Sequence, residues 1–111
     1  MERPRDWHGI LDRDAAYGQS RGSGVTCGTT ALQVLQANSR RKRAIFVNDS
    51  DTVIYLFKGP PGSCALNAGI RLNANGGSWI ETPDVLGYFW RGPFSAITSI
   101  ATKVLVVTEE I

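Results

Sequence analysis

Two apolar runs separated by a short polar turn form the clearest pattern in the chain. The segment RAIFVNDSDTVIYLF, residues 43–57, has β-branched and aromatic residues in both runs and Asn, Asp and Ser between them. Residues of the first kind favour strands, and residues of the second kind favour turns. The pattern therefore predicts a β-hairpin. Both faces of both runs are apolar, so we expect a second sheet to cover one side of the hairpin and a neighbouring subunit the other.

The chain after residue 24 continues with short predicted strands. VTCGTTALQVLQA predicts one strand, or two broken at Gly28, with a helix over 31–36 as an alternative. Further strands are predicted over GIRL, SWIE, VLGYFWRG, FSAITSIA and KVLVVTEEI. The connections GPPGSCALNAG and NANGG are rich in turn-forming residues. Several short strands with a turn about every ten residues predict an all-β domain over residues 25–111, a small antiparallel β-sandwich or barrel.

Residues 1–24 have a different composition from the rest of the chain. Charges of both signs follow one another, and the segment ends in the flexible run GQSRGSG. This pattern predicts an extended N-terminal arm. Its large apolar residues are candidate anchors that become buried against a partner: Trp7, Ile10, Leu11 and Tyr17. The alternative is a disordered leader with incidental apolar residues.

Charge and cysteine content exclude several kinds of chemistry. The formal net charge is +2, from 12 basic and 10 acidic residues, which is too balanced for a general nucleic-acid binder. His8 is the single histidine, and neither Cys27 nor Cys64 has a CxxC partner, so we expect no zinc site. There is no GxSxG motif. The sequence therefore predicts a protein that is not an enzyme and has no cofactor.

The acidic residues and the cysteines each allow two interpretations. Asp49, Asp51 and Asp84 could be proposed as a calcium or acid–base cluster, but the NDSD spacing is more typical of a turn whose side chains bind its own amides. We expect no metal site. The two cysteines are expected to be free buried thiols, and a disulfide remains an alternative if their strands are neighbours.

Two further groups of residues are candidate contact sites. The first is the basic run Arg40, Arg41, Lys42 and Arg43. It is interpreted either as a solvated turn or as a patch that contacts an acidic protein surface or DNA. The second is the set of aromatic residues Trp79, Tyr88, Phe89, Trp90 and Phe94. Core and subunit interface is the favoured interpretation of these aromatics, and a sugar-binding platform is the alternative.

No apolar run approaches the ~20 residues that cross a bilayer, and the N-terminus lacks the apolar stretch of a signal peptide. We therefore expect the chain to be made and kept in a reducing cytoplasm, with no membrane contact.

The strings LQVLQANSRRKRAIFVNDSDTVIYLFKG, NAGIRLNANGGSW and GPFSAITSIATKVLVVTEE resemble a set of small virion structural proteins of tailed bacteriophages. The resemblance covers residues 29–110 and leaves the arm outside it. It implies a non-enzymatic virion component made in the host cytoplasm, with an accessory (decoration) protein on the capsid as the best single role. A neck, tail or head-fibre component is the alternative within this class, and a carbohydrate-binding module for host surface glycans is the alternative from another class.

The resemblance and the composition together imply the partners. The expected partners are other copies of the chain and virion proteins such as the major capsid protein. A homo-oligomer is expected because a domain of this size cannot easily cover a hairpin that is apolar on both faces. A trimer is favoured by analogy with phage accessory proteins.

Overall fold

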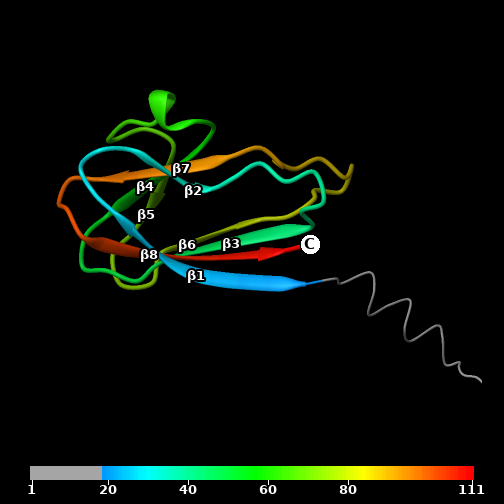
Figure 1. Ribbon diagram of the computed structural model, residues 1–111, viewed down its shortest axis with the longest axis horizontal. Helices are drawn as coiled ribbons and strands as arrows, with labels where there is room; N and C mark the ends of the chain where they lie inside the picture. Colours follow the sequence, from blue (N-terminus) through cyan, green and yellow to red (C-terminus); the bar gives the residue numbers. More distant parts are fainter. Residues whose placement is uncertain (1–18) are drawn as a thin grey trace, which may run out of the picture.

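The computed structural model describes residues 19–111, which form two antiparallel four-stranded sheets packed face to face (Figure 1). In order across the first sheet, the strands are β1 (Ser20–Cys27), β8 (Lys103–Glu110), β3 (Arg43–Asn48) and β6 (Ser78–Glu81). In order across the second, they are β2 (Leu32–Leu35), β7 (Phe94–Thr98), β4 (Ile54–Lys58) and β5 (Ile70–Leu72). A short 3₁₀ helix, η1 (Pro61–Ser63), follows β4. The predicted antiparallel β-sandwich is confirmed, and β2 replaces the alternative helix over 31–36.

The core lies between the two sheets because alternate side chains of each strand point inward. On β3 the fully buried side chains include Ala44 and Phe46, and on β4 they are Ile54 and Leu56. The ring of Phe46 lies 4.5 Å from that of Phe94 on β7, centroid to centroid. The contact between these two rings therefore joins the two sheets inside the core.

The predicted hairpin over residues 43–57 is wrong. β3 pairs with β6 and β8, whereas β4 pairs with β5 and β7, so the two strands face each other across the core as an arch. The alternating pattern correctly indicated two strands, but alternation is the same whether the strands are paired or stacked. The turn decides between these arrangements, and here its side chains bind across the gap between the sheets.

Asn48 holds this arch together. Its buried side-chain Nδ2 donates hydrogen bonds to the carbonyls of Thr52 (2.8 Å) and Leu72 (2.9 Å), and its Oδ1 accepts one from Ser50 Oγ (2.7 Å). The backbone of Asn48 also pairs with the β5–β6 connection, with Gly77 O at 2.8 Å and Gly76 N at 2.8 Å. The NDSDT and NANGG segments are therefore hydrogen-bonded to each other at one end of the sandwich. Both segments serve to hold the fold together.

The boundary of the predicted arm is also corrected. β1 begins at Ser20 and pairs with β8 over its whole length, so residues 20–24 belong to the sheet. No apolar pattern marks them, because the first five residues of this edge strand are exposed. Residues 1–18, which contain the anchors Trp7, Ile10, Leu11 and Tyr17, lie outside the described residues.

The predicted strand VLGYFWRG is a loop, since no strand lies between β6 and β7. The Asp84 carboxylate accepts hydrogen bonds from the N–H groups of Leu86 (2.8 Å) and Tyr88 (3.0 Å), and Gly87 has a φ of 84°. This turn chemistry prevents the aromatic run from extending into a strand. Within residues 19–111, no helix has the length and apolar character needed to cross a membrane.

Candidate functional site

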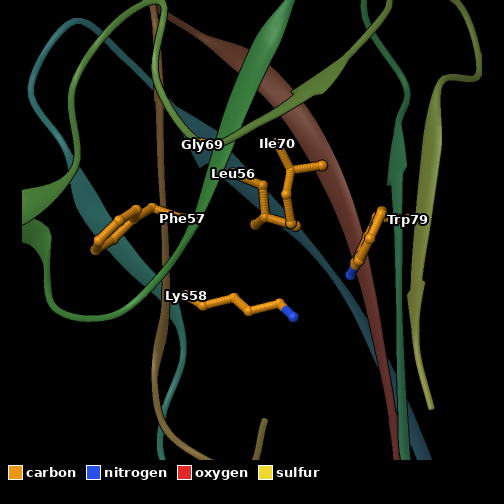
Figure 2. A pocket seen from close by; sticks show the side chains of 6 residues that line it. All are labelled: Leu56, Phe57, Lys58, Gly69, Ile70 and Trp79. Carbon is orange, nitrogen blue, oxygen red and sulfur yellow. The ribbon is translucent and has the colours of Figure 1, made fainter. Parts of the chain in front are cut away.

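A pocket of about 270 Å³ opens where the edge strands β5 and β6 leave the sandwich uncovered (Figure 2). Its lining comes from β4, β5, β6 and the residue before β5, and consists of Leu56, Phe57, Lys58, Gly69, Ile70 and Trp79. Figure 2 shows Trp79 facing Leu56 and Ile70, with Lys58 directed toward Trp79. An apolar cavity of about 150 Å³ holds a benzene-sized molecule, so this pocket has room for one large apolar side chain.

Glu81 fixes one wall of the pocket. Its Oε1 accepts a hydrogen bond from Trp79 Nε1 at 3.0 Å and lies 2.9 Å from Lys58 Nζ, while its Oε2 accepts one from the Trp90 N–H at 2.9 Å. Burial by itself would raise the pKa of Glu81, but the Trp90 N–H, Lys58 and the Trp79 N–H outweigh it and hold the pKa below its usual range. The indole of Trp79 is thereby fixed against Lys58, whose Nζ lies 5.6 Å from the ring centroid.

Gly69 allows β5 to approach β4 at the floor of the pocket. Its φ is 84°, and a Cβ at this position would lie 2.5 Å from the carbonyl oxygen of Leu56. Only glycine combines this backbone conformation with this close approach. The shape of the pocket therefore depends on a residue that contributes no side chain.

The loop over residues 82–93 follows the pocket directly and presents apolar side chains to solvent. Val85 is fully exposed, Leu86 is 72% exposed and Tyr88 is 71% exposed. The Asp84 turn orders this segment, and the Trp90 N–H joins its far end to Glu81 in the pocket wall. We call the pocket together with Val85, Leu86 and Tyr88 the docking surface.

The five predicted interface aromatics occupy different environments. Trp79 lines the pocket and Tyr88 is exposed, but Phe94 is fully buried, so it belongs to the core part of the favoured interpretation and not to an interface. Phe89 lies under the Arg91 guanidinium, 4.1 Å from centroid to Cζ, and Trp90 donates its Nε1–H to Pro93 O at 2.8 Å. All five residues of β7 are buried, and the Phe94 ring packs against Phe46 across the core.

The basic run is divided between core and surface, so the prediction of a contact patch is corrected for Arg41. Arg41 is fully buried, and its guanidinium bonds to Glu109 Oε2 (2.9 Å) and to the carbonyls of Gln36 (2.7 Å) and Gly92 (2.9 Å). Arg40, Lys42 and Arg43 are exposed, and Arg43 pairs with Glu110 at 2.7 Å. A buried arginine with several partners contributes to packing and is not available for surface contact.

The predicted acidic residues are not gathered at one site. Asp51 pairs with Lys103 at 2.7 Å, and the hydrogen bond from Lys103 lowers its pKa, while Asp84 caps its own turn. No group of three or more His, Cys, Asp or Glu residues that could hold a metal ion lies in the part of the chain that the structure describes. Cys27 and Cys64 are buried free thiols, and burial, with a smaller effect of Cys64, raises the pKa of Cys27 to about 11.

Sequence reasoning did not select Lys58, Ile70 or Glu81 for the pocket. Lys58 and Glu81 end strands that lie in different sheets, so nothing in their spacing indicates that they meet. The one available signal was that Lys58 and Glu81 each end an apolar strand. A charged side chain at such a position becomes buried only when a partner of opposite charge is present. No family model, no curated protein and no solved structure matches this chain.

Proposed function

We propose that this chain is a non-enzymatic structural protein of a tailed-phage virion that attaches through the docking surface. The observation that carries the proposal is the ordered loop with exposed Val85, Leu86 and Tyr88, which follows the pocket strand β6 along the chain. Contiguous exposed apolar groups mark protein interaction sites, and a loop held by its own hydrogen bonds loses little conformational entropy on binding. The sequence resemblance to virion proteins supplies the kind of partner.

The best role within this class is an accessory protein on the outside of the capsid, with the major capsid protein as partner. A neck, tail or head-fibre component is the alternative role. The protein would act as a homo-oligomer, with a trimer favoured, made in the host cytoplasm and incorporated into the virion. Repetition over many copies converts weak contacts into stable attachment.

A carbohydrate-binding module is less well supported by the aromatic residues. Aromatic side chains bind sugars by stacking of the sugar on an open ring face. The Lys58 ammonium lies over the Trp79 ring and the Arg91 guanidinium over the Phe89 ring, so one face of each ring already has a partner within the protein. Binding to a glycan array that is lost on changing Trp79 would favour the module over the virion protein.

The variant Leu86→Asp tests the docking surface. Burial of a leucine side chain contributes roughly 1.5–3 kcal/mol, so its loss should weaken attachment to particles that lack the protein by about tenfold or more. Leu66→Asp is the matched control, because Leu66 is 41% exposed in a different loop. Circular dichroism should show both variants folded. Equal attachment of Leu86→Asp and wild-type protein to these particles would refute the docking surface.

A further inference from the structure

The outer edge of β1 is an unpaired row of backbone hydrogen-bonding groups. Gln19 and Ile111 exchange both backbone hydrogen bonds, at 2.9 Å and 2.8 Å, which fixes the phase of the β1–β8 ladder. In an antiparallel ladder every second residue turns its N–H and C=O away from the partner strand. The outward groups on β1 therefore belong to Ser20, Gly22, Gly24 and Thr26, and none of them has a backbone partner within residues 19–111.

This edge has the features that favour addition of another strand. β1 has eight residues, whereas the other three edge strands, β6, β2 and β5, have three or four. Two of its four outward residues are glycines, so little side-chain bulk restricts approach. Natural edge strands are usually short or protected by charges and prolines, and long unprotected edges accept a strand from another chain.

A groove of about 210 Å³ lies beside the same edge, between β1 and β2. Val34 and Leu35 supply its apolar wall, and Arg21 and Glu109 supply its charges. The side chain of Arg21 is 62% exposed and contacts Glu109 at 3.4 Å, whereas Arg41 holds the same carboxylate at 2.9 Å. Arg21 therefore retains donors for an acidic group that enters the groove.

We propose that residues 7–13 of a neighbouring protomer add to this edge as an antiparallel strand. The proposed register sets Asp12 opposite Arg21 and Ile10 opposite Ser23. Charge complementarity selects this register, since it brings a carboxylate to the exposed guanidinium and an isoleucine to the apolar wall of the groove. Leu11 and Gly9 then face Gly22 and Gly24, with no bulky side chain opposite Leu11. The inference rests on the homo-oligomer of the proposed function and names its contact.

The length of the N-terminal segment and the place where it joins β1 favour a neighbour over the same chain. Eighteen residues precede Gln19, and an extended segment from there to Trp7 reaches about 40 Å at ~3.3 Å per residue. The four-stranded sheet is only about 14 Å wide at ~4.8 Å per strand spacing. Return to the same β1 requires a reversal within residues 15–18, where Gly18 is the single typical turn-forming residue and Ala15, Ala16 and Tyr17 are not.

Disulfide trapping tests the partner and the register together. Ile10→Cys with Ser23→Cys places two thiols at a non-hydrogen-bonded pair, where Cα atoms lie ~4.5 Å apart and a disulfide can form. Mild oxidation of the purified full chain should give interchain bonds on a non-reducing gel. Ile10→Cys with Ser20→Cys is the control, because this pair is out of register and on opposite faces. An intrachain bond, no bond, or equal bonding in the control would overturn the proposal.

A backbone variant tests the edge without any change to the N-terminal segment. Gly24→Pro removes one outward N–H and leaves the bonds to β8 intact, whereas Gly24→Ala keeps the N–H. A Cβ at Gly24 meets only Val104 Cγ1 at 3.4 Å, an ordinary contact. Light scattering should show a shift of Gly24→Pro toward the 12.1 kDa monomer, with Gly24→Ala still assembled. Equal assembly of both folded variants would overturn the proposal, while the attachment test with Leu86→Asp would still judge the virion role.

Discussion

Asn48→Ala should destabilise the protein more than any other single change in the NDSDT turn. The variant removes three hydrogen bonds of a fully buried side chain, two donated to the carbonyls of Thr52 and Leu72 and one accepted from Ser50 Oγ. Each is worth about 0.5–1.5 kcal/mol net, and a buried carbonyl left without a donor costs a further ~1–3 kcal/mol. The expected loss is therefore about 3–7 kcal/mol, a large part of a typical total of ~5–15 kcal/mol.

Urea unfolding followed by circular dichroism measures this loss. Ser50→Ala is the graded control, since it removes hydroxyl bonds to Asn48 Oδ1 and to Thr52 O, and we expect about 1 kcal/mol. Asp49→Ala is the neutral control, because Asp49 is exposed, and we expect a change within about 0.5 kcal/mol. If Asn48→Ala unfolds within 1 kcal/mol of wild type with an unchanged urea dependence, the side chain of Asn48 does not hold the arch.

Three further predictions follow from the pocket and the core. Because the pKa of Glu81 is lowered in the folded protein, its carboxylate stabilises the fold above the ordinary glutamate pKa of ~4.3. This stabilisation is lost as the pH falls through the lowered pKa. The urea midpoint of the wild type should therefore fall more steeply with acid than that of Glu81→Gln. Arg41→Met should lower the free energy of unfolding in urea by about 3–5 kcal/mol, because it leaves the Glu109 carboxylate buried without its main partner. Adding Glu109→Gln to this variant should recover part of the loss. Gly69→Ala should cost more than about 1 kcal/mol because of its positive φ and the Leu56 carbonyl, whereas Gly62→Ala, with open space around its Cβ, should be nearly neutral in the same assay.

Alternation and turn residues predicted the strands but not their pairing. Residues 43–57 do contain two strands, yet the choice between hairpin and arch depends on where the Asn48 side chain binds, which is a contact with the distant Leu72 carbonyl. Residues 20–24 of β1 were missed for the opposite reason. Its exposed glycines and serines carry no burial pattern, and only pairing with β8 at the far end of the chain makes it a strand.

The candidate site was only partly predictable. Trp79 and Tyr88 were selected as large aromatics, and they do lie on the docking surface, but the same criterion also selected Phe94, which belongs to the core. Residue type cannot separate these positions, because an aromatic ring contributes similar burial in a core and at an interface. Arg41 shows the same limit for charge, since its burial depends on Glu109, which is distant in the sequence.

Quantitative mass spectrometry of purified phage particles tests the virion proposal most directly. The measurement compares the copy number of this chain with that of the major capsid protein. An accessory capsid protein predicts copy numbers of the same order, and a much smaller number would indicate a neck, tail or head-fibre component. Complete absence of the chain from purified particles would contradict the proposed function.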